Sequence, residues 1–165
     1  MRTLAVKKWK KAEAKTAMTD IAASVSDAFG VEVPEIYNLK DKFPDWGQWE
    51  WCFDDVEVWT KAGPATLNIN IDAKFAHMFF RFQDPQRAVC FDDGMGRLNR
   101  HSGKWNSLEV APNPLRFWIE CLKSDFAKVA EKNPNSDDVV AHEVKKAKEQ
   151  EKWDSYFSDE KRRLG

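Results

Sequence analysis

The clearest strand signal in this chain is the segment Thr66-Leu67-Asn68-Ile69-Asn70-Ile71-Asp72. Its apolar and polar side chains alternate, so that Leu67, Ile69 and Ile71 point to one face and the polar side chains to the other. Alternation of this kind is typical of an antiparallel sheet that buries one face and leaves the other open to solvent. We therefore predict that this segment is a strand of an antiparallel sheet.

Further segments on both sides of it carry strand signals of the same kind. These alternating segments are residues 48–53, 56–60, 75–82, 88–91 and 104–110. We expect Gly63-Pro64 to form the turn before the central strand, because both residues are common in turns. The stretch Tyr37–Gly47 contains the breakers Pro44 and Gly47 and is predicted to be a loop. The sheet is therefore predicted to have about four to six strands.

Helical patterns precede and follow these strands. Residues 3–29 repeat apolar side chains every three or four positions, and Gly30 is expected to end this helix. Asn113-Pro114 is expected to begin a second helix, because asparagine caps helices well and proline fits their first turn. The apolar stripe of this second helix runs from Leu115 to Val129.

A last helix is predicted after Ser136, which we expect to act as its cap because Asp137 and Asp138 follow. The order of elements predicts an α+β fold, with an antiparallel sheet, one N-terminal helix and two C-terminal helices. We expect a single globular domain over residues 1–165, with frayed ends at about residues 1–3 and 159–165.

The composition restricts the class of protein. The chain has 165 residues, and its 26 Lys+Arg are balanced by 27 Asp+Glu, for a formal net charge of -1. A nucleic-acid-binding protein usually has a clear basic excess, so the overall charge does not favour that class. No run of about 18 apolar residues occurs, and we therefore expect no membrane-spanning segment.

The cysteines and histidines show no pattern of a metal site or a disulfide framework. Cys52, Cys90 and Cys121 lack paired spacing, so we predict reduced thiols in a cytoplasmic protein. The histidines stand far from the cysteines, and no complete phosphate-binding glycine motif is present. We therefore expect no cofactor and no bound metal.

Tryptophan is unusually frequent, with eight residues in the chain. Four of them lie within fourteen residues, at positions 46, 49, 51 and 59, and residues 41–60 hold six acids and one lysine. The strand pattern places Trp49 and Trp51 in the core and leaves Trp59 as an exposed anchor. Two interpretations of the cluster stay open, an aromatic core and an aromatic–acidic surface that suits a basic protein partner.

A polar segment later in the chain concentrates hydrogen-bond donors. Arg97, Arg100, His101 and Lys104 stand within eight residues, in and just after a glycine-containing loop at residues 92–103. Such donors suit the recognition of phosphate or carboxylate groups. A polar surface loop without a ligand is the alternative interpretation.

Acidic residues near a lysine suggest an enzymatic alternative. Pro44-Asp45 and Asp72-Ala73-Lys74 together resemble the PD-(D/E)xK pattern of nucleases. The resemblance implies a metal-dependent nuclease or phosphodiesterase in which Asp55, Asp72 and Lys74 hold Mg²⁺ and orient a water molecule. That fold continues with a helix after the lysine, whereas residues 75–82 here alternate like a strand. A charged turn between two strands explains the same residues.

Two short segments resemble small uncharacterised proteins of tailed phages. They are the turn Asp84-Pro85-Gln86-Arg87-Ala88 and the segment Ser102-Gly103-Lys104-Trp105-Asn106. The resemblance implies an accessory protein of a mobile element that binds and modulates a host protein, and it assigns no role to any residue.

These observations lead us to predict a non-enzymatic binding module with a protein partner. The residues we expect at the contact are Trp59, Arg97, Arg100, His101 and Lys104. Nucleic-acid binding through the basic N-terminal helix is a further alternative, carried by Lys7, Lys8, Lys10 and Lys11. A solvated basic face explains the same lysines.

Overall fold

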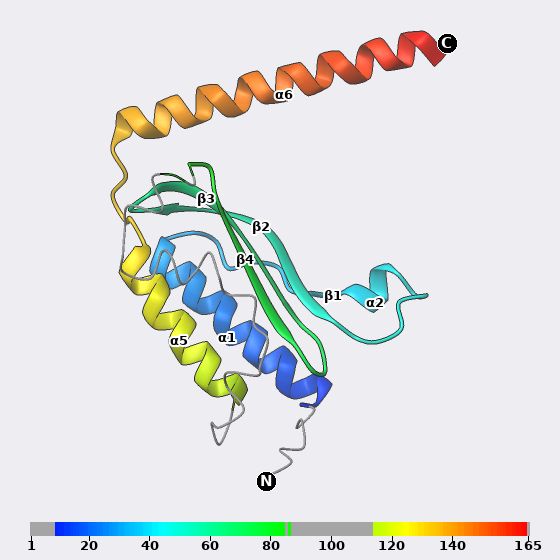
Figure 1. Cartoon of the computed structure of the whole chain (residues 1–165), viewed down its shortest axis with the longest axis vertical. Helices are drawn as coiled ribbons and strands as arrows, with labels where there is room; N and C mark the ends of the chain where they lie inside the picture. Colours follow the sequence, from blue (N-terminus) through cyan, green and yellow to red (C-terminus); the bar gives the residue numbers. More distant parts are fainter. Residues whose placement is uncertain (1–8, 85, 87–113, 165) are drawn as a thin grey trace. The chain divides into compact units, whose positions relative to one another are not determined.

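The computed structural model describes residues 9–84, residue 86 and residues 114–164. The chain divides into two compact units, Met1–Lys132 and Asn133–Gly165. The first unit holds a sheet with two long helices, and the second unit consists mainly of helix α6, Ser136–Leu164 (Figure 1). Each unit is described by itself below.

The sheet is an antiparallel meander in the order β1-β2-β3-β4. Its strands in the described residues are β1 Tyr37–Asn38, β2 Trp51–Thr60, β3 Gly63–Ile71 and β4 Ala76–Phe82. The predicted α+β fold with an antiparallel sheet is thus confirmed, at four strands. The strands predicted at residues 88–91 and 104–110 lie outside the described residues.

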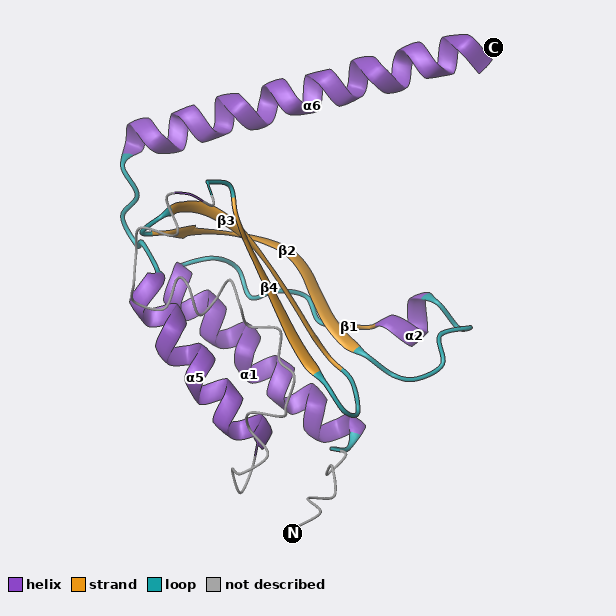
Figure 2. Ribbon diagram, in the orientation of Figure 1, coloured by secondary structure: helices purple, strands orange, loops and turns teal. Residues whose placement is uncertain are grey.

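Helices α1, Lys11–Phe29, and α5, Pro114–Val129, cover one face of this sheet (Figure 2). Leu67, Ile69 and Ile71 of β3 are at most 1% exposed and belong to one core cluster with the apolar stripes of both helices. Phe29 at the end of α1 contacts the ring of Phe126 in α5 edge-on, at 5.6 Å between centroids. The alternation that predicted β3 therefore also determines which face receives the helices.

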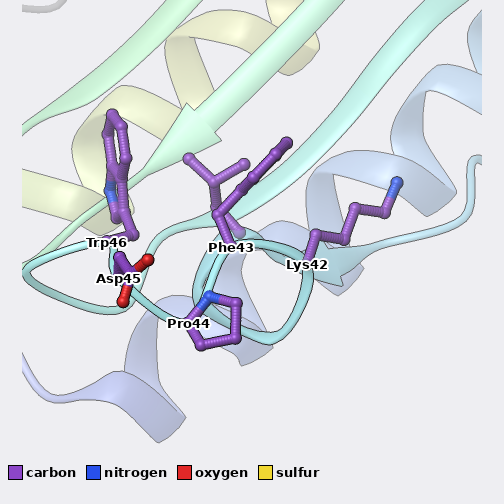
Figure 3. Close-up of a pocket in the computed structure, with 6 residues that line it drawn as sticks. Lys42, Phe43, Pro44, Asp45 and Trp46 are labelled. Atoms are coloured by element: carbon purple, nitrogen blue, oxygen red, sulfur yellow. The ribbon is translucent and has the colours of Figure 1, made fainter.

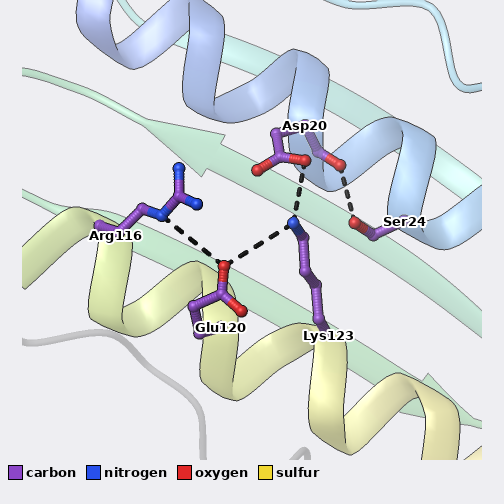
Figure 4. Close-up of polar contacts among 5 residues, drawn as sticks. All are labelled: Asp20, Ser24, Arg116, Glu120 and Lys123. Atoms are coloured by element: carbon purple, nitrogen blue, oxygen red, sulfur yellow. Dashed lines mark hydrogen bonds and ion pairs between the residues drawn. The ribbon is translucent and has the colours of Figure 1, made fainter.

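Polar contacts connect α1 and α5 at their solvent side (Figure 4). Lys123 Nζ lies 3.1 Å from Asp20 Oδ1 and 3.8 Å from Glu120 Oε1. Arg116 Nε approaches the same Glu120 oxygen at 3.7 Å. The side chains of these ion pairs are between about one third and two thirds exposed, so we expect them to orient the helices and to contribute only modestly to stability.

The start of α1 differs from the prediction, since Trp9 and Lys10 are not helical. The Trp9 side chain is buried, and its indole N–H donates a hydrogen bond to the backbone carbonyl of Asp72. Trp9 thus contacts the β3–β4 turn, and the backbone of Lys10 is extended, with φ -80° and ψ 153°, so the helix begins at Lys11. The predicted end of α1 is confirmed, because Gly30 has φ 67° and its N–H donates to the Ser26 carbonyl at 2.9 Å.

The predicted turn at Gly63-Pro64 is wrong, because both residues belong to β3 and the turn is Lys61-Ala62. The buried hydroxyl of Thr60 explains the difference. It donates to the Gly63 carbonyl at 2.8 Å and accepts the Ala62 N–H at 3.0 Å, which closes a turn of two residues. Lys61 N–H also donates to the Val129 carbonyl in α5 at 2.9 Å.

The cap of helix α6 lies one residue earlier than predicted, and the helix ends later than predicted. The side chain of Asn135 accepts the Asp137 N–H at 2.8 Å, so Asn135 acts as the cap in place of Ser136. The helix continues to Leu164, through residues that the sequence predicted to fray, and none of its residues is buried. Among the helices of the described ranges, none has the length and apolar character needed to cross a membrane.

We expect Phe126→Ala to lower the free energy of unfolding by about 3–5 kcal/mol, because this fully buried ring would leave a cavity between α1, α5 and the sheet. Phe117→Ala in the same helix is the matched control, since that ring is 51% exposed, and it should change stability by less than about 0.5 kcal/mol. Urea unfolding of both variants measures the difference. Equal losses would contradict the packing described for α5.

Candidate functional site

The segment between β1 and β2 projects from the sheet, and we call residues 39–50 the aromatic loop. It starts with the short helix α2, Leu39–Lys42. The buried side chain of Asn38 joins its two ends, because Asn38 Oδ1 accepts the Lys40 N–H at 3.3 Å and the Glu50 N–H at 3.2 Å. Leu39 N–H also donates to the Glu50 carbonyl at 2.8 Å. The predicted loop thus contains a short strand and a helical turn with fixed ends.

A pocket of about 410 Å³ lies in this loop (Figure 3). It is lined by Leu39, Lys42, Phe43, Pro44, Asp45 and Trp46. The rings of Phe43 and Trp46 extend to the same side of the loop in Figure 3, and they are 58% and 47% exposed. Backbone hydrogen bonds of 2.9 Å hold both residues in place, from Phe43 N–H to Leu39 and from Trp46 N–H to Phe43.

The four clustered tryptophans have different environments. Trp51 is buried and donates its indole N–H to the Lys11 carbonyl at 3.1 Å, while Trp49 is half-buried against the core. The predicted core position is therefore confirmed for Trp51, while Trp49 packs against the core without belonging to it. Trp59 is half-buried in β2, and the exposed tryptophan is Trp46, which the sequence reasoning did not select. The sequence signal for the exposure of Trp46 was its position between Pro44 and Gly47, which break regular structure.

The base of the aromatic loop is connected to β2 through Tyr37. The Tyr37 hydroxyl donates a hydrogen bond to the Asp54 carboxylate, and Lys42 Nζ lies 3.8 Å from the centroid of the Tyr37 ring. Burial, together with this bond to Asp54, raises the pKa of the Tyr37 hydroxyl well above its usual value. Tyr37 therefore keeps its proton and remains a donor at neutral pH.

Cys52 is opposite Tyr37 in the sheet and is 5% exposed. Burial, with the neighbouring carboxylates of Glu50 and Asp54, raises the pKa of this thiol to about 12. Its sulfur donates to the Glu50 carbonyl at 3.7 Å. These surroundings are those of an unreactive buried thiol.

A β-bulge between Phe53 and Val56 interrupts the alternation of β2 and exposes two consecutive acids, Asp54 and Asp55. Asp55 has φ 53°, a left-handed conformation that aspartate tolerates better than most residues. Its N–H donates to Asn68 Oδ1 on β3 at 2.8 Å. The bulge therefore adds negative charge to the strand that follows the aromatic loop.

The outer face of β4 carries a second group of exposed rings. His77 lies 5.9 Å from Phe75 and 6.5 Å from Phe79, measured between ring centroids. Phe79 is 59% exposed and stands opposite Asn68 of β3. These rings therefore provide a second exposed aromatic surface on the sheet.

The structure does not bring the proposed nuclease residues together. The Asp72 carboxylate accepts the backbone N–H groups of Lys74 and Phe75 at 2.8 and 2.7 Å, as expected for a charged turn. The backbone N–H of Asp55 is hydrogen-bonded to Asn68 of β3. Asn68 stands four residues before Asp72, a separation of about 13 Å along an extended strand. Within the described ranges, no group of three His, Cys, Asp or Glu side chains could hold a metal ion.

The other predicted contact residues are distributed differently. Arg97, Arg100, His101 and Lys104 lie outside the described residues, as do Lys7 and Lys8 of the basic N-terminal segment. Lys10 and Lys11 are exposed at the start of α1. The Nζ atoms of Lys11 and Lys15 lie 5.7 and 5.1 Å from the centroid of the Trp51 ring. Part of this basic group thus packs on the protein's own aromatic core.

No known protein family, curated protein or solved structure matches the chain.

We expect Cys52 to resist thiol reagents in the folded protein. A pKa of about 12 leaves about 1,000-fold less thiolate at pH 8 than a cysteine with its ordinary value of 9.0. In the double variant Cys90→Ser, Cys121→Ser, the remaining thiol should therefore react at least that much more slowly with Ellman's reagent than the same chain in denaturant. Similar rates in both states would show that Cys52 is accessible.

We expect the stability of variants at position 55 to depend on how well the new residue tolerates a left-handed backbone. Asp55→Val should lower the free energy of unfolding by about 1–2 kcal/mol, because a β-branched side chain is strained at φ 53°. Asp55→Gly, which adopts this conformation without strain, should stay within about 0.5 kcal/mol of the parent protein. Chemical denaturation of the two variants gives the comparison, and equal stabilities would argue against the bulge.

Proposed function

We propose that this chain is a non-enzymatic protein-binding module whose contact surface is the aromatic loop. The observation that carries the proposal is the exposure of Phe43 and Trp46 on the same pocket, although the loop backbone is held by hydrogen bonds. Exposed rings that line a hollow are typical of surfaces that bind another molecule. Tryptophan is also among the residues that contribute most to protein interfaces.

The exposed area of these two rings is large enough to contribute several kcal/mol to binding. About half of each ring is exposed, and aromatic side chains bury about 150–250 Å² each, so a partner could cover about 200 Å² on the two rings. At about 25 cal/mol per Å² this corresponds to about 5 kcal/mol before the cost of association. A few such contacts, with the matching area on the partner, suffice for a specific complex.

The held backbone of the loop also supports a binding role. A flexible loop must be ordered when it binds, and the lost conformational entropy reduces affinity. Here Asn38 joins both ends of the loop, and two internal hydrogen bonds hold Phe43 and Trp46. Most of this ordering is therefore complete before a partner arrives.

The alternatives receive less support from the geometry. A nuclease needs Asp55 and Asp72 around one cation, and they are separated along β3. A nucleic-acid-binding surface would be expected to be basic, whereas residues 41–60 hold six acids and one lysine. The resemblance to small tailed-phage proteins noted above suggests which partner is bound. We therefore propose that the natural partner is a host protein.

The test is a selection of binding peptides from a random displayed library, using the full chain as bait. Peptides selected on the parent protein should lose at least about 30-fold in affinity for Trp46→Ala, the loss of a typical hot-spot residue. Phe79→Ala is the matched control, because its ring is at least as exposed as that of Trp46 but lies on β4. Peptides that keep their affinity for Trp46→Ala, or that lose it for Phe79→Ala, would overturn the proposal.

A further inference from the structure

We infer that the pocket of the aromatic loop accepts one bulky apolar side chain of a partner polypeptide, and that cationic residues flank this side chain in the partner. The inference rests on the proposed function and specifies the chemistry of the partner. It follows from the lining of the pocket and from the charges around it.

The pocket itself selects an apolar group. Its volume of about 410 Å³ is at the small end of the range for ligand sites, which suits a single large side chain better than an extended ligand. The walls are formed by Leu39, Phe43, Pro44 and Trp46, and only Lys42 and Asp45 contribute charged side chains. An aliphatic or aromatic side chain inserted there would complete the burial of both exposed rings.

The two charged side chains of the lining are not equivalent. The Lys42 ammonium lies 3.8 Å from the centroid of the Tyr37 ring, so this charge already has an interaction within the protein. Asp45 has no hydrogen bond or ion pair with any of the described residues, and the same is true of Asp41 in α2. Asp45 is therefore the charged side chain of the lining that has no interaction within the described part of the protein, whereas Lys42 is already engaged.

Further acidic residues lie on β2, the strand that follows the aromatic loop. Asp54 is tied to Tyr37 at the base of the loop, and the bulge in β2 exposes Asp55 next to it. A cationic side chain beside the inserted apolar group would meet Asp45 and the faces of exposed aromatic rings, both of which attract cations. An anionic partner segment would gain neither attraction, so a cationic flank is favoured over a phosphate backbone.

The experiment compares three short fluorescein-labelled peptides that share a central tryptophan and differ only in their flanks. Two arginines, two glutamines or two glutamates stand on each side, and anisotropy with the full chain gives the affinities. At an ionic strength of about 0.01 M the arginine peptide should bind at least about tenfold more tightly than the glutamate peptide. At about 0.15 M this difference should shrink, because exposed charges are screened.

Two charge variants test whether Asp45 causes the preference for cationic flanks. Asp45→Asn should weaken binding of the arginine peptide by about two- to fivefold, as expected for one exposed charge pair, and leave the glutamine peptide unchanged. Asp27→Asn, an exposed acid on α1, is the matched control and should change nothing. Trp46→Ala should abolish binding of all three peptides, since each uses the same pocket.

The outcomes separate this inference from the proposed function. If the glutamine or glutamate peptide binds as tightly as the arginine peptide, and Trp46→Ala still abolishes binding, the cationic preference is wrong and the binding pocket stands. Arginine-peptide binding that survives Trp46→Ala would show attraction by charge alone and would overturn the inference. Absence of binding by the arginine peptide would also overturn it, while the library selection on Trp46 decides the proposed function independently.

Discussion

The burial of one face of β3 is the constraint on which the first unit of the structure depends. Leu67, Ile69 and Ile71 have almost no exposed surface, and a strand can bury such a row only if another layer covers it. Helices α1 and α5 supply this layer with their apolar stripes. Because neighbouring strands follow the register of β3, the same row also determines which side chains of β2 and β4 point outward.

A buried amide at the edge of this sheet contacts both ends of the aromatic loop and adds to the backbone hydrogen bond between Leu39 and Glu50. Asn38 lies next to Trp51 in the β1–β2 pairing, and its side-chain oxygen accepts N–H groups from both ends of the loop. A buried carbonyl oxygen can satisfy two donors, and both of these donors would otherwise lack a partner at the sheet edge. The rings of Phe43 and Trp46 therefore stand on a backbone fixed by the core, although they do not belong to the core themselves.

The sequence predicted those parts of the fold whose signal is local. Alternation marked β3, and helical periodicity with Gly30 marked the end of α1, because burial on one face leaves a regular pattern. The turn after β2 was misplaced, since its position depends on the Thr60 hydroxyl and on a contact with Val129 that is distant in sequence. The structure within residues 37–42 was missed for the same reason, because Asn38 finds its partner at Glu50.

The candidate site was predicted only in outline. The sequence analysis singled out residues 41–60 because they are rich in aromatic and acidic residues, but strand alternation can assign faces only within a strand. It therefore placed Trp49 and Trp51 and could say nothing of Trp46, which lies in the loop. The loop residues Arg97, Arg100, His101 and Lys104 lie outside the described residues, and their proposed contact role stays a prediction.

Phe43 and Trp46 differ from the other exposed rings of the first unit, such as Phe79 and Phe117, in that they line a common pocket. Neither belongs to the core cluster, which already closes the sheet against α1 and α5. Smaller polar residues would satisfy a surface loop equally well and would avoid the risk of non-specific association that exposed rings carry. The contact outside the chain that we propose would account for two rings that the scaffold holds but does not bury, and the pocket that they line is where we expect it to form.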